Sequence, residues 1–505
     1  MEKNTILAVI LSFIVILLWY RFFLPKVVPP TPVEVKTVPR EVTVSSEEGK
    51  ISLPKKQVVQ AVEEITLDTA GQRIIFTSAG AAVKQWTLKE KNNGVDLVLS
   101  SEGQYLFLST LPELNYRVLN RDKNITFQST TSEGIVITKR YEFSEDTNYH
   151  RLIIELDNHT GQDNKIDNFL LTLGPGLDTD EKDKRENLRI LRALLYRNKE
   201  VEKVKPGEYK NTDWLWAGID NRYFLVALVP ENKFDFLRME KVGKDKLPLL
   251  SFGRNLTLPA NTKVRLVHNF YLGPKKYVDL KKYKLGLEKS VNFGFFAPLS
   301  QGALYSLNWL YSLTRNYGWA IVILTLFLQI LLFPLTRKSF QASISLKKLQ
   351  PMIDQVKLKY KNDPKRFQAE LFALYKNQKV NPFGGCLPMI LQIPVFWALF
   401  TTLHSTYELR SAPFILWISD LSRPDALFRI GSISINILPL LMGLLMLYQQ
   451  KLTTVTADPQ QAKMMYLMPV VFTFIFWNFP SGLVLYWLTS SLFSTLGQFY
   501  LMKRA

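Results

Sequence analysis

The chain has 505 residues, of which 47% are apolar and 21% are charged, and its formal net charge is +19. One cysteine, Cys386, excludes an intramolecular disulfide, and four scattered histidines form no cluster for a metal site. Eleven basic and three acidic residues lie between Arg337 and Lys379, whereas 405–435 holds three of each. Basic residues concentrate in this way in cytoplasmic loops of membrane proteins, so we expect no sequence-specific nucleic-acid partner.

The first segment, 1–25, is predicted to be a signal anchor that is not cleaved. Residues 6–20 are apolar apart from Ser12, and Arg21 follows where a cleavable signal would have small residues. Residues 26–60 are rich in Pro, Val, Thr, Glu and Lys, which predicts a flexible, extended linker.

Residues 61–290 are predicted to form an all-β domain. Short runs rich in β-branched and aromatic residues, bounded by Gly, Asn, Asp or Pro, fill this part of the chain; examples are ITLDTAG, QRIIFTSAG, GIVITKRYEF, HRLIIELDNHT, YFLVALVP and KVRLVHNFYLG. Strands in such number predict packed antiparallel sheets. The charged stretch 182–203 (KDKRENLRILRALLYRNKEVEK) predicts one surface helix among them.

From 291 to 505 the pattern becomes helical. Residues 297–315 predict an amphipathic helix in the plane of the membrane interface, with Leu299, Leu307 and Leu310 on one face; a helix packed on the domain is the alternative. Five apolar runs follow and are interpreted as short membrane spans, at about 319–335, 387–404, 433–448, 464–477 and 483–501. With the first segment they make six spans, which place both termini in the cytoplasm and the β domain outside.

Residues 340–380 predict a cytoplasmic helical hairpin. Apolar residues such as Leu349 and Ile353 repeat at heptad spacing, and Asp363-Pro364 supplies the N-cap and first residue of the second helix. Two interpretations remain open: a solvated connection, or a docking surface for a ribosome, a nascent chain or anionic lipid. The candidate docking surface, here called the basic patch, consists of Lys347, Lys348, Lys357 and Lys359.

Polar residues within the predicted spans are the candidate functional groups. They are Thr325, Gln329, Gln392, Asn436, Tyr486 and Ser490. Because polar groups are costly in lipid, we expect them to face a shared interior; hydrogen bonding between helices is the alternative interpretation. These runs contain no carboxylate or lysine, which argues against a proton- or ion-coupled pump.

Three stretches carry a resemblance to a known family: KVNPFGGCLPMILQIPVFWALF (379–400), ELRSAPFILWISDLS (408–422) and TTVTADPQQAKMMYLMPVVFTFIFWNFPSGLVLYW (453–487). In order and spacing, 290–505 resembles the YidC membrane protein insertases, relatives of the mitochondrial and plastid insertases. The resemblance implies a periplasmic β-supersandwich before five core spans, in the inner membrane of a Gram-negative-type bacterium. It also implies a hydrophilic groove open to cytoplasm and lipid.

The resemblance assigns roles to particular positions. Thr325 would face the groove, and the substrate path would follow Ile393, Phe396, Tyr486 and Trp487. The family usually has an arginine where this sequence has Gln329, which hydrogen-bonds but carries no charge. The implied partners are nascent membrane proteins and the Sec translocon.

The expected function is therefore the insertion and folding of integral membrane proteins, without an enzymatic reaction, cofactor or metal. Partitioning of the substrate into lipid would supply the energy, and the sequence has no Walker or GxGxxG signature. A transporter or channel with a periplasmic β sensor domain is an alternative, which inverted repeats and membrane-buried charges would favour. A sugar-binding or sugar-modifying β domain on a membrane scaffold is another, which paired acids at a characteristic spacing would favour.

Overall fold

The computed structural model describes residues 62–69, 71–89, 94–99, 105–109, 114–122, 124–144, 147–179, 183–210, 213–361, 363–378, 380, 387–430, 433–453 and 459–504. The signal anchor predicted for 1–25, the linker predicted for 26–60 and Cys386 lie outside the described residues.

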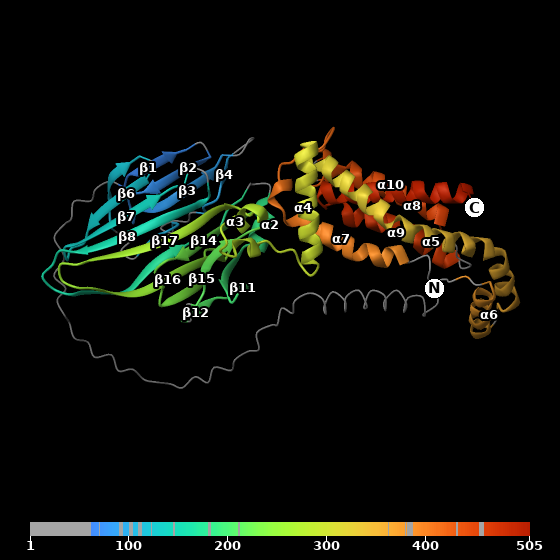
Figure 1. Ribbon diagram of the computed structural model, residues 1–505, viewed down its shortest axis with the longest axis horizontal. Coiled ribbons are helices and arrows are strands. Elements are labelled where there is room, and N and C mark those ends of the chain that lie inside the picture. The colour runs from blue at the N-terminus through green and yellow to red at the C-terminus, as the bar shows by residue number, and fades with distance from the viewer. Residues whose placement is uncertain are drawn as a thin grey trace. The chain divides into compact units, whose positions relative to one another are not determined.

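Three antiparallel sheets build the β domain, as the prediction for 61–290 requires (Figure 1). A four-stranded sheet has the order β1-β2-β3-β4, with bounds Glu64–Asp68, Gln72–Thr77, Ala82–Leu88 and Val95–Asp96. A nine-stranded sheet has the order β11-β10-β13-β14-β17-β8-β7-β6-β5, with bounds Glu200–Lys203, Arg192–Arg197, Trp216–Asp220, Phe224–Pro230, Lys263–Pro274, Tyr149–Asn158, Ile135–Glu142, Asn124–Thr130 and Arg117–Arg121. A second four-stranded sheet has the order β12-β15-β16-β9, with bounds Gly207–Tyr209, Phe236–Val242, Leu247–Leu258 and Asn164–Leu173.

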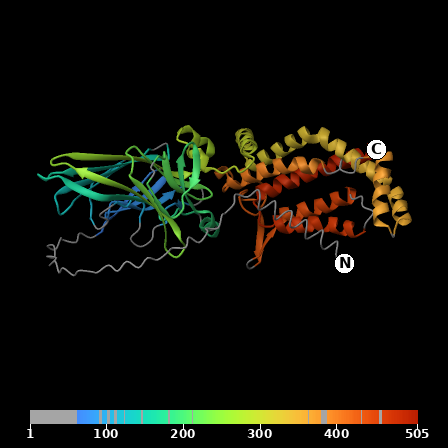
Figure 2. The ribbon, with the colours of Figure 1, turned by 90° about the horizontal axis from the view of Figure 1, so that it is seen from below.

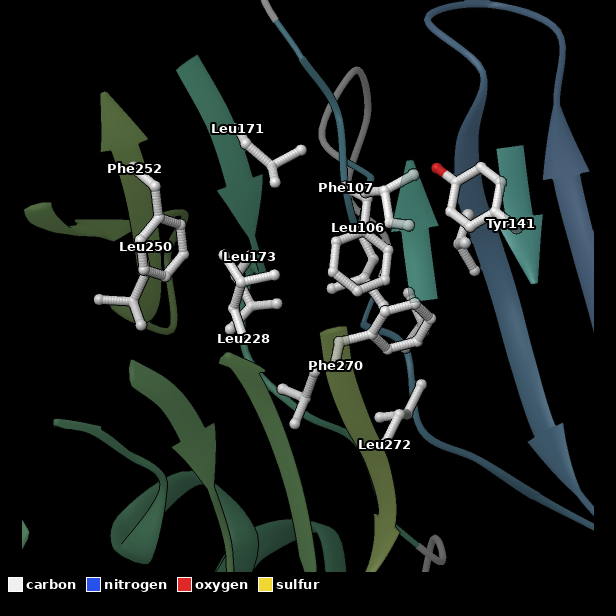
Figure 3. Packing of buried hydrophobic residues seen from close by; sticks show 14 of the residues in the cluster. Leu106, Phe107, Tyr141, Leu171, Leu173, Leu228, Leu250, Phe252, Phe270 and Leu272 are labelled. Carbon is white, nitrogen blue, oxygen red and sulfur yellow. The ribbon is translucent and has the colours of Figure 1, made fainter. Parts of the chain in front are cut away.

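One hydrophobic core joins the three sheets. Side chains alternate between buried and half-buried along β7, as expected of a strand with one face on a core. Figure 3 shows Phe270 of β17 close to Phe107, and Leu173 of β9 facing Leu228 of β14. The rings of Phe76 in β2 and Tyr141 in β7 have centroids 5.0 Å apart. The large sheet therefore packs against both smaller ones, which is a layered sandwich.

The helix predicted for 182–203 is wrong over most of its length. Only Lys184–Ile190 is helical, as α2, and the chain continues as the hairpin of β10 and β11. Asn198 and Lys199 both have positive φ angles, 51° and 65°, as the favoured two-residue hairpin turn requires. β10 also pairs with β13, so sheet hydrogen bonds outweigh a helical preference that is worth only tenths of a kcal/mol per residue.

After the sheets the chain is mainly helical. α3 (Tyr277–Lys282) and the 3₁₀ turns η2 (Leu287–Ser290) and η4 (Tyr407–Leu409) are short, and β18 (Ala426–Ile430) pairs with β19 (Ile433–Asn436). The longer helices are α4 (Ala297–Thr314), α5 (Tyr317–Lys359), α6 (Pro364–Asn377), α7 (Leu387–Ser405), α8 (Ile437–Thr453), α9 (Pro459–Phe476) and α10 (Ser481–Arg504). The helix after β19 therefore begins at Ile437, four residues later than predicted.

The predicted span 319–335 and the first arm of the hairpin are one helix, α5, of 43 residues. It continues past the other helices of the bundle and ends where α6 turns back (Figures 1 and 2). The Asp363 side chain accepts a hydrogen bond from the backbone N–H of Arg366 at 3.1 Å, which confirms the predicted N-cap of α6. Leu349 and Ile353 are buried in the hairpin, as the heptad pattern predicted.

The helix predicted at 297–315 is α4, but its faces differ from the prediction. Leu307 and Leu310 are buried, whereas Leu299 is 52% exposed. A second apolar row, which includes Trp309 and Leu313, is also exposed. Both sides of α4 are thus apolar, one packed against protein and one uncovered.

Among the described helices, α5 is long and apolar enough to cross a membrane. Shorter apolar helical stretches cover Ile437–Leu452 and Lys463–Phe476. The outward side chains of the bundle are apolar and large; exposed examples are Phe327, Ile330, Leu331, Leu444, Leu467, Phe474, Leu496 and Phe499. A contiguous apolar exterior of this kind is suited to lipid.

Candidate functional site

Two glutamine side chains from different helices meet α10 on successive turns. Gln329 of α5 donates a hydrogen bond from Nε2 to the hydroxyl of Ser490, and Gln392 of α7 donates from Nε2 to the hydroxyl of Tyr486. Tyr486 and Ser490 are four residues apart and so share one face of α10. The structure therefore joins four of the predicted polar residues in one place, here called the polar node.

The inward face of α5 is set by its helical period. Ile321, Thr325 and Gln329 are buried at intervals of four residues, while Ile323 and Phe327 are exposed. Thr325 is 1% exposed, and its hydroxyl donates to the carbonyl oxygen of Ile321 at 2.6 Å. Its polarity is thus satisfied within its own helix, one turn before Gln329.

Each glutamine keeps hydrogen-bonding capacity beyond its bond to α10. A side-chain amide has two N–H donors and a carbonyl oxygen with two acceptor positions, and the bond to Ser490 occupies one donor of Gln329. The amide of Gln329 can therefore form further hydrogen bonds while it keeps its bond to Ser490. In this structure the node joins α5 and α7 to α10 through side-chain hydrogen bonds.

Aromatic side chains continue from the node along α7 and α10. The ring of Phe396 meets that of Trp487 edge-on at 5.1 Å, and Trp487 also contacts Phe476 at 5.3 Å. Ile393 is 46% exposed, so it presents an apolar side chain at the outer edge of this cluster. Three of the predicted path residues, Ile393, Phe396 and Trp487, are thus apolar residues of α7 and α10, and the fourth, Tyr486, belongs to the polar node.

A narrow crevice, too tight to admit a water molecule, adjoins Gln329 between α5 and α10. Its lining residues are Gln329, Phe333, Thr336, Phe340, Phe493, Ser494 and Gly497. Gly497 lies against α5 here, and a Cβ at this position would be in ordinary van der Waals contact with the Phe333 ring, at 3.4 Å. The crevice extends the node along α5, toward the hairpin end of that helix.

Asn436 is buried, but its bonds lie at a different level of the bundle. Its Nδ2 donates to the carbonyl oxygen of Trp477 at 2.5 Å, at the junction of β19 with α8. The indole N–H of Trp477 donates in turn to the carbonyl oxygen of Ser434 at 3.1 Å. The structure therefore connects Asn436 to the end of α9 and not to the glutamines of the node.

A second polar row on α10 was not identified from the sequence. Ser491, Thr495 and Gln498 are 8%, 5% and 4% exposed, and the hydroxyl of Thr495 donates to the carbonyl oxygen of Ser491 at 2.8 Å. Their spacing of four and three residues could have revealed this face. Oε1 of Gln498 is buried without a hydrogen-bond partner among the described residues.

Charged groups gather where α7 ends. Arg222 donates from Nε to the carbonyl oxygen of His404 at 2.8 Å, and its Nη1 lies 3.1 Å from Oε2 of Glu186. The hydrogen bond with His404 and the charge of Arg222 lower the pKa of Glu186 below its ordinary value. Arg423 pairs with Asp183 at 2.9 Å. These ion pairs tie α2 and the β13–β14 turn to the helical part.

The basic patch lies on the hairpin portion of α5. Lys347, Lys348 and Lys359 are exposed and Lys357 is half-buried. Large apolar side chains are exposed on the same hairpin, with 45% for Met352, 76% for Leu358 and 60% for Phe372. The hairpin surface is thus both cationic and apolar, a combination that the heptad pattern alone did not predict. Among the described residues, no group of three or more His, Cys, Asp or Glu side chains is placed to hold a metal ion.

Comparison with known proteins matches the chain to two family models, and the boundary between the matched ranges falls inside α4. Residues 65–305 match the family model described as YidC periplasmic domain, and 309–505 match the model described as 60Kd inner membrane protein. A membrane protein insertase YidC from Endomicrobium trichonymphae is 42% identical over 519 residues, which cover 100% of this chain and 98% of the relative. Another, from Pelobacter propionicus, is 35% identical over 546 residues, which cover 100% of this chain and 99% of the relative. A crystal structure of an active YidC insertase has a TM-score of 0.41 and 21% identity, covering 88% of this chain and 93% of that one.

Proposed function

The chain belongs to the YidC family of membrane protein insertases, inner-membrane proteins with a periplasmic domain that insert proteins into the membrane, and from this premise we propose that substrates pass the polar node. The bonds from Gln329 and Gln392 to one face of α10 are the observation that carries this proposal. They place exchangeable amide groups where α5, α7 and α10 meet.

The node would reduce the cost of moving polar substrate segments. A charged side chain at the bilayer centre costs about 2.5–3.5 kcal/mol on insertion scales. Amide and hydroxyl groups that release their partners can hydrogen-bond such a segment while it crosses. The aromatic surface around Phe396 and Trp487 would then guide the apolar helix of the substrate sideways into lipid. Partitioning supplies the energy, so no enzymatic step is involved.

We further propose six spans: the segment 1–25, the first part of α5, and α7, α8, α9 and α10. This topology keeps the hairpin and the C-terminus in the cytoplasm and the β domain in the periplasm. The apolar exterior of the described bundle supports it. α4 would lie in the outer interface with Trp309 and Leu313 toward lipid, since both are exposed.

Nascent membrane proteins are the substrates of the family, and the basic patch suggests how they reach this chain. We propose that the hairpin docks the ribosome or the emerging chain, because it exposes lysines beside Leu358 and Phe372. Anionic lipid would compete for the same charges. Cooperation with the Sec translocon is a further proposal, and it rests on the family resemblance alone.

Site-specific photocrosslinking tests the proposed path. The chain is reconstituted in protein-free liposomes with a single-span substrate, with a photoreactive residue at Ile393 or, as the matched control on the same helix, at Thr402. Thr402 is fully buried and bonded to the carbonyl oxygen of Ser300, away from the node. We expect crosslinks to the substrate from 393 and none from 402. Equal crosslinking from both positions, or none from 393 during active insertion, contradicts the path.

A further inference from the structure

A cavity of about 430 Å³ opens between the edge of the nine-stranded sheet and the segment that leads into α4. β10 and β11 form one wall, with Arg192 and Lys203, and η2 forms another, with Glu288 and Lys289. The volume is in the range of small-ligand sites. None of these residues takes part in the polar node.

Positive charge is in excess around this cavity. The side chain of Lys203 has no hydrogen bond or ion pair with the residues that the structure describes, and Lys289 donates to the carbonyl oxygen of Lys199 and not to a carboxylate. Arg192 binds Asp220 at 2.7 Å, but Asp220 also binds Lys275 at 2.8 Å. One buried carboxylate therefore serves two cations, and Glu288 leaves a surplus of about two positive charges. Such a wall favours an anionic group.

The cavity also contains a buried carboxylate oxygen that lacks a hydrogen-bond donor. Oε2 of Glu288 is buried and has no hydrogen-bond partner among the described residues. A buried, unmatched carboxylate oxygen is costly unless a donor reaches it. A simple anion would satisfy the lysines and leave this oxygen unmatched. The ligand should therefore carry a negative group and, a few bonds away, an N–H or O–H donor.

The remaining walls are apolar and lead to the proposed lipid interface. Tyr277 and Phe293 line the cavity with rings in an edge-to-face contact at 5.0 Å. Two residues after Phe293, Phe295 is 79% exposed, and Leu299 in the first turns of α4 is 52% exposed. A ligand with its polar end in the cavity would have an apolar surface beside it, which suits an amphiphile.

We propose that this cavity binds the headgroup of phosphatidylethanolamine, with the phosphate at Lys203 and Lys289 and the ammonium group at Glu288. Its phosphate and its ammonium group supply both required groups at once, and the ammonium group, unlike the neutral hydroxyls of phosphatidylglycerol, would form a charge-assisted hydrogen bond with the Glu288 carboxylate. The site is separate from the polar node, and it uses only the interfacial placement of α4 from the proposed function. A lipid held here would fasten the β domain to the membrane surface beside α4.

Lipid binding to the full chain in detergent tests the site, measured by native mass spectrometry with micelles that contain one phospholipid at a time. Phosphatidylethanolamine and phosphatidylcholine have the same phosphate, but the quaternary ammonium of choline has no N–H. We expect at least tenfold weaker binding of phosphatidylcholine. We also expect the ethanolamine preference to be lost in Glu288→Gln. Phosphatidylglycerol bound as tightly as phosphatidylethanolamine would overturn the choice of headgroup.

Charge variants provide the second arm. The double variant Lys203→Gln/Lys289→Gln should bind phosphatidylethanolamine at least tenfold more weakly. The matched control Lys241→Gln/Lys244→Gln, on exposed positions at the β15–β16 turn, should bind it as the unaltered chain does. Equal binding by both double variants refutes the site. Displacement of the lipid by an equal concentration of inorganic phosphate would assign the cavity to a soluble anion instead. Insertion is assayed separately, so lost binding with intact insertion leaves the proposed function standing.

Discussion

Replacing Gln329 by leucine removes the amide that joins α5 to α10 and keeps the side-chain volume similar. The change deletes the bond to Ser490 at a position that is 8% exposed. Hydrogen bonds between membrane helices contribute about 0.6 kcal/mol on average and about 1.7 kcal/mol at most. We therefore expect Gln329→Leu to fold and to remain in the membrane.

The effect on insertion should be larger and should depend on the substrate. A hydrogen bond to a charged group is worth about 1.5–3 kcal/mol, which corresponds to roughly a 10- to 150-fold change in rate if the bond forms only during passage. Water that enters the open node would replace part of the lost hydrogen-bond energy. For a substrate with a charged outer segment we therefore expect an insertion rate roughly tenfold lower, at the lower end of this range. An uncharged substrate should be inserted at nearly the original rate. Gln329→Arg should be tolerated and should favour acidic segments.

The assay compares initial insertion rates in liposomes for two substrates that differ only in one charged residue of the translocated segment. The matched control is Gln498→Leu, which removes another buried amide, 4% exposed, from the same bundle. This control should lower neither rate, because Oε1 of Gln498 has no partner to lose among the described residues. Equal slowing of both substrates by Gln329→Leu would point to misfolding, and unchanged rates for both would refute the role of the node.

Lys139 is fully buried between two carbonyl oxygens, of Gly80 and Phe107, each 2.9 Å from its Nζ, and burial lowers its pKa to about 7. Since the unfolded chain then binds more protons, the stability of the β domain should rise from pH 7.5 to 9.5 by about 2 kcal/mol, as measured by denaturant titration with tryptophan fluorescence. Lys139→Met should remove that increase, whereas the same slope in both proteins would show that the pKa of Lys139 is not lowered in the folded state. Reversing the four lysines of the basic patch to glutamate should keep the hairpin helical and abolish salt-sensitive ribosome co-sedimentation. Leu349→Asp should instead unfold the hairpin, and normal ribosome binding by both variants would leave it a solvated connection.

Sequence patterns predicted the structure correctly where interactions between residues close in the sequence determine it. Alternating burial along β7 and the Asp363 cap of α6 follow from residues within a few positions of each other. The helix prediction for the segment that forms β10 and β11 was wrong because the strand that pairs with β10, β13, lies about twenty residues away, and no local pattern in the sequence indicates that pairing. The sequence placed Thr325 and Gln329 on one face for the same local reason.

The pairing inside the candidate site could be predicted only in part. Helical spacing showed that Tyr486 and Ser490 share a face, but not that Gln329 and Gln392 would both reach it. That outcome depends on which helices become neighbours, which is a tertiary property. Asn436 shows this limit of sequence-based prediction. Its polarity suggested that it faces the same interior as Gln329 and Gln392, but its side chain bonds to the carbonyl oxygen of Trp477. The cavity beside Glu288 gave no signal in the sequence, since its residues are spread from β10 to α4.

The continuity of α5 makes it a mechanical link. A helix of 43 residues spans about 65 Å, so the hairpin end lies roughly 45 Å from Gln329 along one rod. Pro334 and Pro351 interrupt its backbone hydrogen bonds and provide two points where the rod can bend. The hairpin is therefore joined to the node by continuous helix and not by a loop, and the bend point at Pro334 lies five residues from Gln329, whose side chain bonds to Ser490.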